Sequence, residues 1–148
     1  MAEILGSDFN DILIGSDDSD QIYGFQGDDL LLGMSGNDEI HGEEGADLLV
    51  GLDGDDLLYG GSDADVFAFG EGSGHDTIAD FADQQDRIDL TSLTTLHDFG
   101  QILAHSSQSG ADTVIDLGAA AGHAGGEDVL TLAGFDMARL DASDFILS

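Results

Sequence analysis

The first half of the chain alternates short apolar runs with turns that are rich in glycine and aspartate. A large apolar residue stands at the centre of each run, and these residues recur at a spacing of nine: Leu13, Ile22, Leu31, Ile40, Leu49, Leu58 and Phe67. Side chains alternate between the two faces of a strand, so the pattern predicts three-residue strands that each bury the middle side chain. Because such short strands are unstable alone, we expect them to stack as a coil with parallel neighbours.

Two polar columns share this spacing of nine residues. A glycine stands five residues before an aspartate in every repeat: Gly6, Gly15, Gly24, Gly33, Gly42, Gly51 and Gly60 precede Asp11, Asp20, Asp29, Asp38, Asp47, Asp56 and Asp65. Glycine readily adopts the positive φ angles that tight turns need. Each repeat is therefore expected to hold a tight turn followed by its strand.

These repeats resemble the RTX (repeats-in-toxin) calcium-binding nonapeptide family, with consensus G-G-x-G-x-D-x-U-x. The segments GFQGDDLLL, GMSGNDEIH, GEEGADLLV and GLDGDDLLY match it except for the second glycine, which only the seventh repeat, GGSDADVFA, keeps. The resemblance implies an all-β fold, a right-handed parallel β-roll in which two nonapeptides form one turn. Repeats eighteen residues apart would then stack. We assign residues 1–69 to this roll.

Carboxylates beside bared backbone carbonyls suit a hard cation with oxygen ligands, and calcium fits better than magnesium or a transition metal. Asp11, Asp29, Asp47 and Asp65 are expected to stack on one edge of the roll, and Asp20, Asp38 and Asp56 on the other. Calcium ions between stacked turns would give about five sites. The resemblance implies further ligands from main-chain oxygens around Gly24, Gly27, Gly33, Gly36, Gly42, Gly45, Gly51, Gly54 and Gly60.

Three turns depart from the consensus, because Phe9, Asp18 and Asp63 replace the glycine at the fourth position. Calcium sites are therefore expected first of all in the middle of the array. Asp28 and Asp55, beside the motif aspartates, are interpreted as solvated charges rather than ligands.

Composition supports a cation-dependent fold. The 148 residues include 32 acidic but only 2 basic side chains, for a formal net charge of -30, while 41% of residues are apolar, which argues against disorder. Such a surface repels nucleic acid and anionic membranes and attracts cations. Cysteine is absent, and no apolar run is long enough to span a membrane. Because closely stacked carboxylates repel one another, folding is predicted to require calcium.

The outward-pointing residues differ between the two faces of the predicted roll. Odd-numbered repeats present Ile12, Ile14, Leu30, Leu32, Leu48, Val50, Val66 and Ala68, whereas even-numbered repeats present Gln21, Tyr23, Glu39, His41, Leu57 and Tyr59. A contiguous apolar face on a soluble protein is normally covered. Our hypothesis is that residues 70–148 pack on this odd-repeat face, and the alternative is a dimer formed through it.

The spacing of nine stops after residue 70. Strands are predicted at 66–69, 75–81, 86–90, 112–117, 127–132 and 144–147, with one short helix in TSLTTLHDFGQILAHS after a Thr91 or Ser92 cap. This order resembles the β-rich cap of serralysin-type proteases and alginate epimerase accessory modules. The terminal DFILS is similar to the uncleaved signal read by type I secretion systems. We assign 70–148 to such a cap, packed on the roll as one structural unit.

No catalytic pattern accompanies the repeats, because the five histidines lack metal-ligand spacing and neither a G-x-S-x-G turn nor a phosphate-binding loop occurs. We therefore expect no enzyme activity. The leading hypothesis is a secreted, extracellular calcium-binding RTX module that folds after type I export. The alternatives are an accessory module for an alginate-like polysaccharide and the tail of a larger secreted enzyme.

Overall fold

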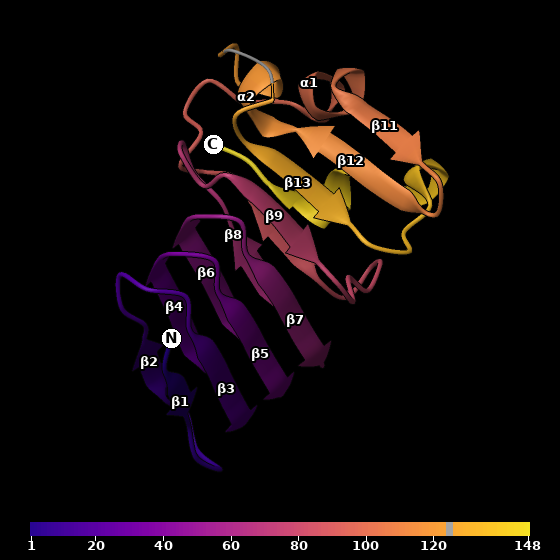
Figure 1. Cartoon of the computed structure of the whole chain (residues 1–148). Helices are drawn as coiled ribbons and strands as arrows, with labels where there is room; N and C mark the ends of the chain where they lie inside the picture. The colour runs from indigo at the N-terminus through magenta and orange to yellow at the C-terminus, as the bar shows by residue number, and fades with distance from the viewer. Residues whose placement is uncertain (124–125) are drawn as a thin grey trace.

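The computed structural model describes residues 1–123 and 126–148. Its first half is a coil in which successive strands alternate between two parallel sheets (Figure 1). One sheet contains β1 (Glu3–Leu5), β3 (Gln21–Gln26), β5 (Glu39–Glu44) and β7 (Leu57–Ser62). The other contains β2 (Ile12–Ile14), β4 (Leu30–Ser35), β6 (Leu48–Asp53) and β8 (Val66–Ala68). Ile22 pairs with Ile40 and Leu31 with Leu49, the eighteen-residue register predicted for a parallel β-roll, and the fold class is confirmed.

The middle strands are longer than predicted. From β3 to β7 each strand has six residues rather than three, because pairing resumes beyond the glycine that ends the apolar run. Phe25, directly after Gly24, pairs with Glu43 of the next turn in the same sheet. Pairing between β3 and β5 therefore continues on both sides of Gly24.

The predicted column of central apolar residues forms the core of the roll. Ile22, Leu31, Ile40, Leu49, Leu58 and Phe67 are all fully buried. Burying one such side chain contributes about 1.5–3 kcal/mol relative to leaving it in water. Leu13, predicted as part of the column, is only partly buried, so the column holds the two sheets together from Ile22 to Phe67.

The roll extends past residue 69, although the glycine spacing ends there. Strand β9 (His75–Ile78) pairs with β7, β10 (Arg87–Asp89) pairs with β8, and β14 (Phe145–Ile146) pairs with β10. In β9 and β10 an aspartate again stands two residues before a fully buried isoleucine, Ile78 or Ile88. The three-residue pattern of the repeats thus continues after the nine-residue period is lost.

The rest of the C-terminal half caps the end of the sheet that contains β9. The order is β9, β13 (Val129–Leu132), β12 (Asp112–Asp116) and β11 (Ser106–Ser109). The short helices are α1 (Phe99–Ala104) and α2 (Leu117–Ala120), and the 3-10 turns are η1 (Met137–Arg139) and η2 (Ala142–Asp144). Figure 1 shows this group at the end of the coil, away from β1 and β2.

The predicted helix begins later than expected. Its N-cap is Asp98, whose side chain accepts a hydrogen bond from the Gln101 amide, and not Thr91 or Ser92. Leu93 and Leu96 are buried, but they lie in turns ahead of the helix. Consecutive turns share the three-residue spacing of a helix, which explains the error.

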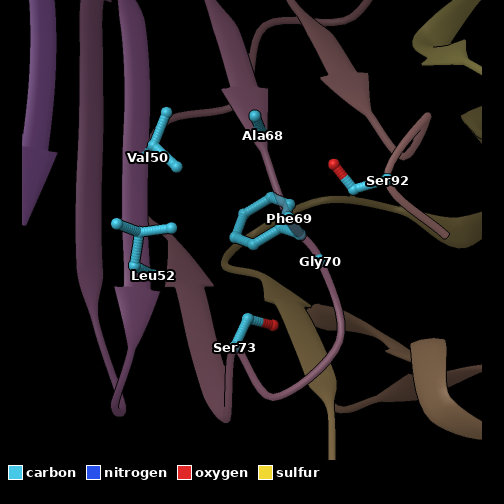
Figure 2. A pocket seen from close by; sticks show the side chains of 7 residues that line it. All are labelled: Val50, Leu52, Ala68, Phe69, Gly70, Ser73 and Ser92. Carbon is cyan, nitrogen blue, oxygen red and sulfur yellow. The ribbon is translucent and has the colours of Figure 1, made fainter. Parts of the chain in front are cut away.

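The C-terminal half does not cover the odd-repeat face as we hypothesised. It stacks on the end of the roll, and Ile12 and Ile14 at the far end of the face are 70% and 53% exposed. At the near end of the face, Val50, Ala68 and Phe69 line a small pocket together with Ser73 and Ser92 of the C-terminal half (Figure 2). The dimer through this face stays a prediction, and light scattering in calcium would measure it.

Within the described residues, no helix has the length and apolar character needed to cross a membrane.

Candidate metal sites at the edges of the roll

The motif aspartates form two hydrogen-bonded stacks, one along each edge of the roll. In each step the backbone N–H of one aspartate donates to Oδ1 of the aspartate eighteen residues later. The N···O distances are 2.7 Å for Asp11 to Asp29, 2.7 Å for Asp20 to Asp38, 2.8 Å for Asp29 to Asp47, 2.8 Å for Asp38 to Asp56 and 2.9 Å for Asp47 to Asp65. The structure thus brings all seven predicted aspartates into the two predicted stacks.

The second carboxylate oxygen is treated differently in the middle of the array. The Oδ2 atoms of five aspartates are buried and have no hydrogen-bond partner among the residues that the structure describes: Asp29, Asp38, Asp47, Asp56 and Asp65. We call these the orphan oxygens. A buried acceptor without a partner costs about 1–3 kcal/mol, and more when it is charged. Five such atoms at equivalent positions indicate a positively charged ligand rather than a series of defects.

Backbone carbonyl oxygens lie beside the orphan oxygens. A Cβ placed on Gly24 would lie 2.7 Å from the carbonyl oxygen of Gly42 and closer still to Oδ2 of Asp29. Gly33 has the same two kinds of neighbour, the Gly51 carbonyl and the Asp38 carboxylate. In these repeats the first glycine therefore keeps open a space where carboxylate and carbonyl oxygens meet, as a calcium site requires. The atoms nearest to a Cβ on Gly51 or Gly60 include the carboxylate of Asp56 or Asp65 but no carbonyl oxygen.

Most of the predicted glycine carbonyls point into a neighbouring turn. The carbonyl oxygens of Gly24, Gly33, Gly42, Gly51 and Gly60 lie close to the glycine eighteen residues earlier, and those of Gly27, Gly36 and Gly54 lie close to a glycine of the following turn. The remaining one of the nine predicted glycines is Gly45, where an added Cβ would meet the Gly27 carbonyl oxygen. These carbonyl oxygens thus lie between turns and not within a single loop.

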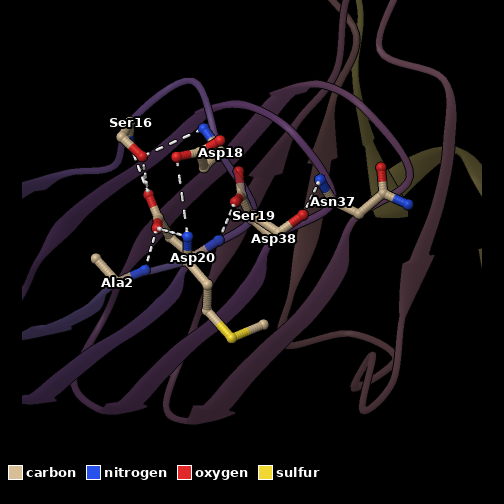
Figure 3. Close-up of polar contacts among 8 residues, drawn as sticks. Ala2, Ser16, Asp18, Ser19, Asp20, Asn37 and Asp38 are labelled. Carbon is tan, nitrogen blue, oxygen red and sulfur yellow. Dashed lines mark hydrogen bonds and ion pairs between the residues drawn. The ribbon is translucent and has the colours of Figure 1, made fainter.

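The first two repeats satisfy their aspartates with serine instead. Oδ2 of Asp20 accepts hydrogen bonds from the Ser16 amide at 2.8 Å and the Ser16 hydroxyl at 2.7 Å (Figure 3). Ser7 does the same for Asp11, at 2.6 and 2.8 Å. These hydrogen bonds replace the charge of an ion with neutral donors. Serine at the second position is therefore the sequence signal that separates these repeats from the others.

Loop conformation supports the same division. Gly27, Gly36, Gly45 and Gly54 have φ between 107° and 142°, and Asp63 reaches 74° at the equivalent position, whereas Phe9 and Asp18 do not have positive φ. The replacement of glycine by Asp63 therefore leaves the loop shape intact, and the neighbouring Asp65 still carries an orphan oxygen. The departures at Phe9 and Asp18 coincide with the serine-satisfied repeats.

Burial changes the acidity of the stacked aspartates. It raises the pKa of Asp47 and of Asp56 to about 6, and that of Asp65 to about 7, with neighbouring carboxylates adding to the effect. The pKa values of Asp29 and Asp38 are also raised by burial. Asp20 is different, because its hydrogen bond from Ser16 lowers its pKa. Without a cation, Asp47, Asp56 and Asp65 would therefore release their protons closer to neutral pH than a free aspartate does.

Two aspartates beyond the repeats continue the stacks and were missed in the sequence. Asp76 accepts a hydrogen bond from the Asp56 amide, and Asp86 accepts one from the Asp65 amide, both at 3.1 Å. Burial raises the pKa of Asp76 to about 8. Their sequence signal is a D-x-I triplet that ends in the buried isoleucine, and these triplets do not follow the nine-residue spacing.

Asp28 and Asp55 are exposed, as interpreted, but they also connect turns. Oδ1 of Asp28 accepts from the Ala46 amide at 2.9 Å, and Oδ1 of Asp55 accepts from the His75 amide at 3.0 Å. Their role in the loops is therefore structural as well as electrostatic.

Comparisons with known proteins agree with this geometry. The sequence matches the model of the RTX calcium-binding nonapeptide repeat over residues 5–40 and 41–78. Among curated proteins, none matches significantly. Two similar solved structures are subunits of the Azotobacter vinelandii mannuronan C5-epimerase. AlgE6R3 has 33% identity, with 95% of this chain and 80% of that chain covered and a TM-score of 0.44. AlgE6R2 has 28% identity, with 97% and 91% covered and a TM-score of 0.58.

The extracellular lipase LipA of Serratia marcescens is also similar, with 16% identity and a TM-score of 0.52. The match covers 99% of this chain but only 40% of the lipase chain. At this identity the likeness concerns the fold alone.

Proposed function

Because the chain belongs to the RTX calcium-binding nonapeptide-repeat family, we propose that it is the calcium-binding module of a secreted protein and folds when calcium binds. The observation that carries the proposal is the set of five buried orphan oxygens. Three of them, in Asp29, Asp38 and Asp47, converge with a backbone carbonyl of an adjacent turn on the first glycine of their repeat. Calcium bound between the turns would supply positive charge to these oxygens. Their number supports about five ions per chain.

The energy available from the ions is large enough to control folding. A free calcium concentration ten times the dissociation constant adds about 1.4 kcal/mol per site by mass action. Five sites would then add roughly 7 kcal/mol, which is comparable with the whole net stability of an ordinary domain. At low calcium the module is expected to be unfolded, and at extracellular calcium it is expected to fold.

Calcium titration of the full chain tests this proposal. Circular dichroism should report little β-structure in calcium-depleted protein and a cooperative gain of it as calcium is added. Calorimetry on the same sample should give about five ions per chain. A complete β spectrum in calcium-depleted protein at neutral pH contradicts the proposal.

Export by a type I system is the second part of the proposal. RTX calcium-binding repeats occur in secreted proteins. The terminal segment forms β14 against β10, so as a signal it would have to be read before the module folds. Co-expression with a type I exporter should place the chain in the medium, and removal of residues 145–148 should retain it in the cell. Equal export of both chains contradicts this part.

A polysaccharide is a second candidate ligand, favoured by an aromatic row on the outer face of the β3–β5–β7 sheet. His41 stacks between Tyr23 and Tyr59, with ring centroids 4.7 and 4.4 Å apart. Both faces of the His41 ring are packed, whereas Tyr59, at the end of the row, stacks on His41 and offers its edge and hydroxyl to a sugar. The two epimerase subunits act in an enzyme named for mannuronan, and with a net charge of -30 an anionic chain would need bridging calcium.

Alginate titration with and without calcium separates this candidate from a purely structural role. Binding that requires calcium and is lost in Tyr59→Ala supports a glycan site on this face. Heat release that Tyr59→Ala leaves unchanged contradicts it. We propose no catalytic role for the module.

A further inference from the structure

A cluster of three carboxylates lies outside the repeats, where the C-terminal segment meets the loop before β10. Asp83 is in the loop between β9 and β10, Asp141 is the N-cap of η2, and Asp144 ends η2 directly before β14. One carboxylate oxygen from each lies within 4.8 Å of the others. Since β14 pairs in parallel with β10, the loops before these two strands lie against each other as successive turns do.

The hydrogen bonds leave two buried oxygens of this cluster unsatisfied. Asp144 is fully buried, and its Oδ2 accepts from the Asp141 amide at 2.7 Å, but its Oδ1 has no partner within residues 1–123 and 126–148. The Asp83 side chain is 11% exposed, and its Oδ1 lacks a partner within the same ranges. An unsatisfied buried acceptor is costly, so both atoms indicate a missing positive ligand.

Arg139 does not supply that ligand. Its guanidinium pairs with Oδ2 of Asp83 at 3.0 Å, on the other side of the carboxylate from the unsatisfied Oδ1. Three carboxylates and one guanidinium leave a formal charge of −2 in the cluster.

We propose that Asp83, Asp141 and Asp144 bind a calcium ion that is separate from the repeat sites and fastens β14 to the roll. All three ligands are carboxylates, which suit a hard cation and not a transition metal. Asp141 is exposed, so water can complete the coordination shell on that side. Calcium tolerates such a mixed and irregular shell better than magnesium, which demands near-ideal octahedral geometry.

The ion has a specific mechanical consequence. Strand β14 contains two residues and pairs with one neighbour, so the ladder alone holds it weakly. An ion shared by the loops before β10 and β14 would keep the terminal strand docked. This inference goes beyond the repeat sites, which contain none of these residues.

Asp141→Asn tests the proposal in the full chain with saturating calcium. Asparagine caps a helical turn as well as aspartate does, so the substitution removes charge while keeping the cap. Asp136→Asn is the matched control, since Asp136 caps η1 in the same way, with its side chain accepting from the Ala138 amide. Calorimetry should give one ion fewer for Asp141→Asn than for wild type, and hydrogen exchange of peptide 141–148 should become at least tenfold faster. Asp136→Asn should match wild type in both measurements.

Equal stoichiometry and equal exchange in Asp141→Asn and Asp136→Asn would overturn the proposal. If Asp141→Asn does not fold in calcium, Asp83→Asn replaces it, because it leaves the η2 cap intact, and the same two losses are expected. The comparison is made between variants of folded protein. Failure of calcium-dependent folding in the wild type would instead overturn the proposed function of the repeats.

Discussion

At the first position of a repeat, glycine leaves space for nearby oxygen atoms, and the backbone there does not need a positive φ. Gly42 does not have a positive φ, yet a Cβ there would lie 2.6 Å from the Gly60 carbonyl oxygen and closer to Oδ2 of Asp47. The second position shows the reverse, because Met34 and Leu52 adopt φ of 85° and 75°. Such conformations cost about 1–2 kcal/mol for residues other than glycine. The array thus tolerates backbone strain at one position but keeps the ligand space clear at the other.

Gly42→Ala should therefore remove calcium binding at the site that contains Asp47. The added methyl group occupies the place where the carboxylate and the carbonyl converge, so we expect calorimetry to show at least one ion fewer. At a tenfold excess of calcium over the dissociation constant this corresponds to about 1.4 kcal/mol of stability. Gly70→Ala is the control, since the nearest atom to its Cβ would be 3.5 Å away at Ser92. An unchanged stoichiometry in Gly42→Ala would contradict the role given to this position.

At the scale of elements, the turns of the roll are joined through acids whose pKa is higher in the folded chain than in a free aspartate. The pKa is raised by burial to about 6 in Asp47 and Asp56 and to about 7 in Asp65, against 3.8 for the unperturbed group. A raised pKa means that the folded state binds more protons than the unfolded state between these values. Stability of the calcium-free roll must then fall as pH rises through this window.

Lowering the pH should therefore stabilise the calcium-free fold and substitute in part for calcium. Calcium-depleted protein is expected to gain β-structure as the pH is lowered from 8 towards 5, and circular dichroism measures the change. Calcium affinity should fall over the same range, because protons and calcium compete for the carboxylates around Asp65, which faces Asp47, Asp80 and Asp86. The variant Asp65→Asn should shift the folding of the calcium-free chain towards higher pH. Calcium-depleted protein that becomes less structured on acidification would contradict this linkage.

The sequence predicts strands both inside and after the nine-residue period, but it places only those inside the period. The strands from β2 to β8, their register and both aspartate stacks follow from the spacing, while β9, β10, β12, β13 and β14 fall within the strands predicted after it. The spacing from Asp56 to Asp76 is twenty residues and from Asp65 to Asp86 twenty-one, so small insertions hide the two added turns from a search for a fixed period. Asp83 and Asp144 meet only because β14 returns to pair with β10, and no local pattern reports such a return.

The pattern also did not predict where the C-terminal half lies. An apolar face such as that of Ile12 and Ile14 shows that burial is favourable, but it does not specify a partner. The end of the roll does specify a partner, because the edges of β7 and β8 would leave backbone N–H and C=O groups unpaired, and β9 and β10 pair with them. Backbone pairing at the end of the coil therefore decided the placement.

For the whole molecule, charge and stacking together predict a change of size with calcium. At a net charge of -30 the calcium-free chain should be expanded, with a radius of gyration of about 40 Å for an unfolded chain of this length, against about 15 Å when compact. Small-angle X-ray scattering should report this contraction as calcium is added.

Sodium chloride at matched ionic strength separates ligation from screening. Monovalent salt weakens the repulsion between exposed carboxylates, but charge screening places no ligand beside the five buried orphan oxygens. In calcium-free sodium chloride, at the same ionic strength as the calcium sample, the chain should therefore stay expanded. If sodium chloride alone produced the compact radius, general charge screening and not site binding would drive folding, and the orphan oxygens would need another explanation.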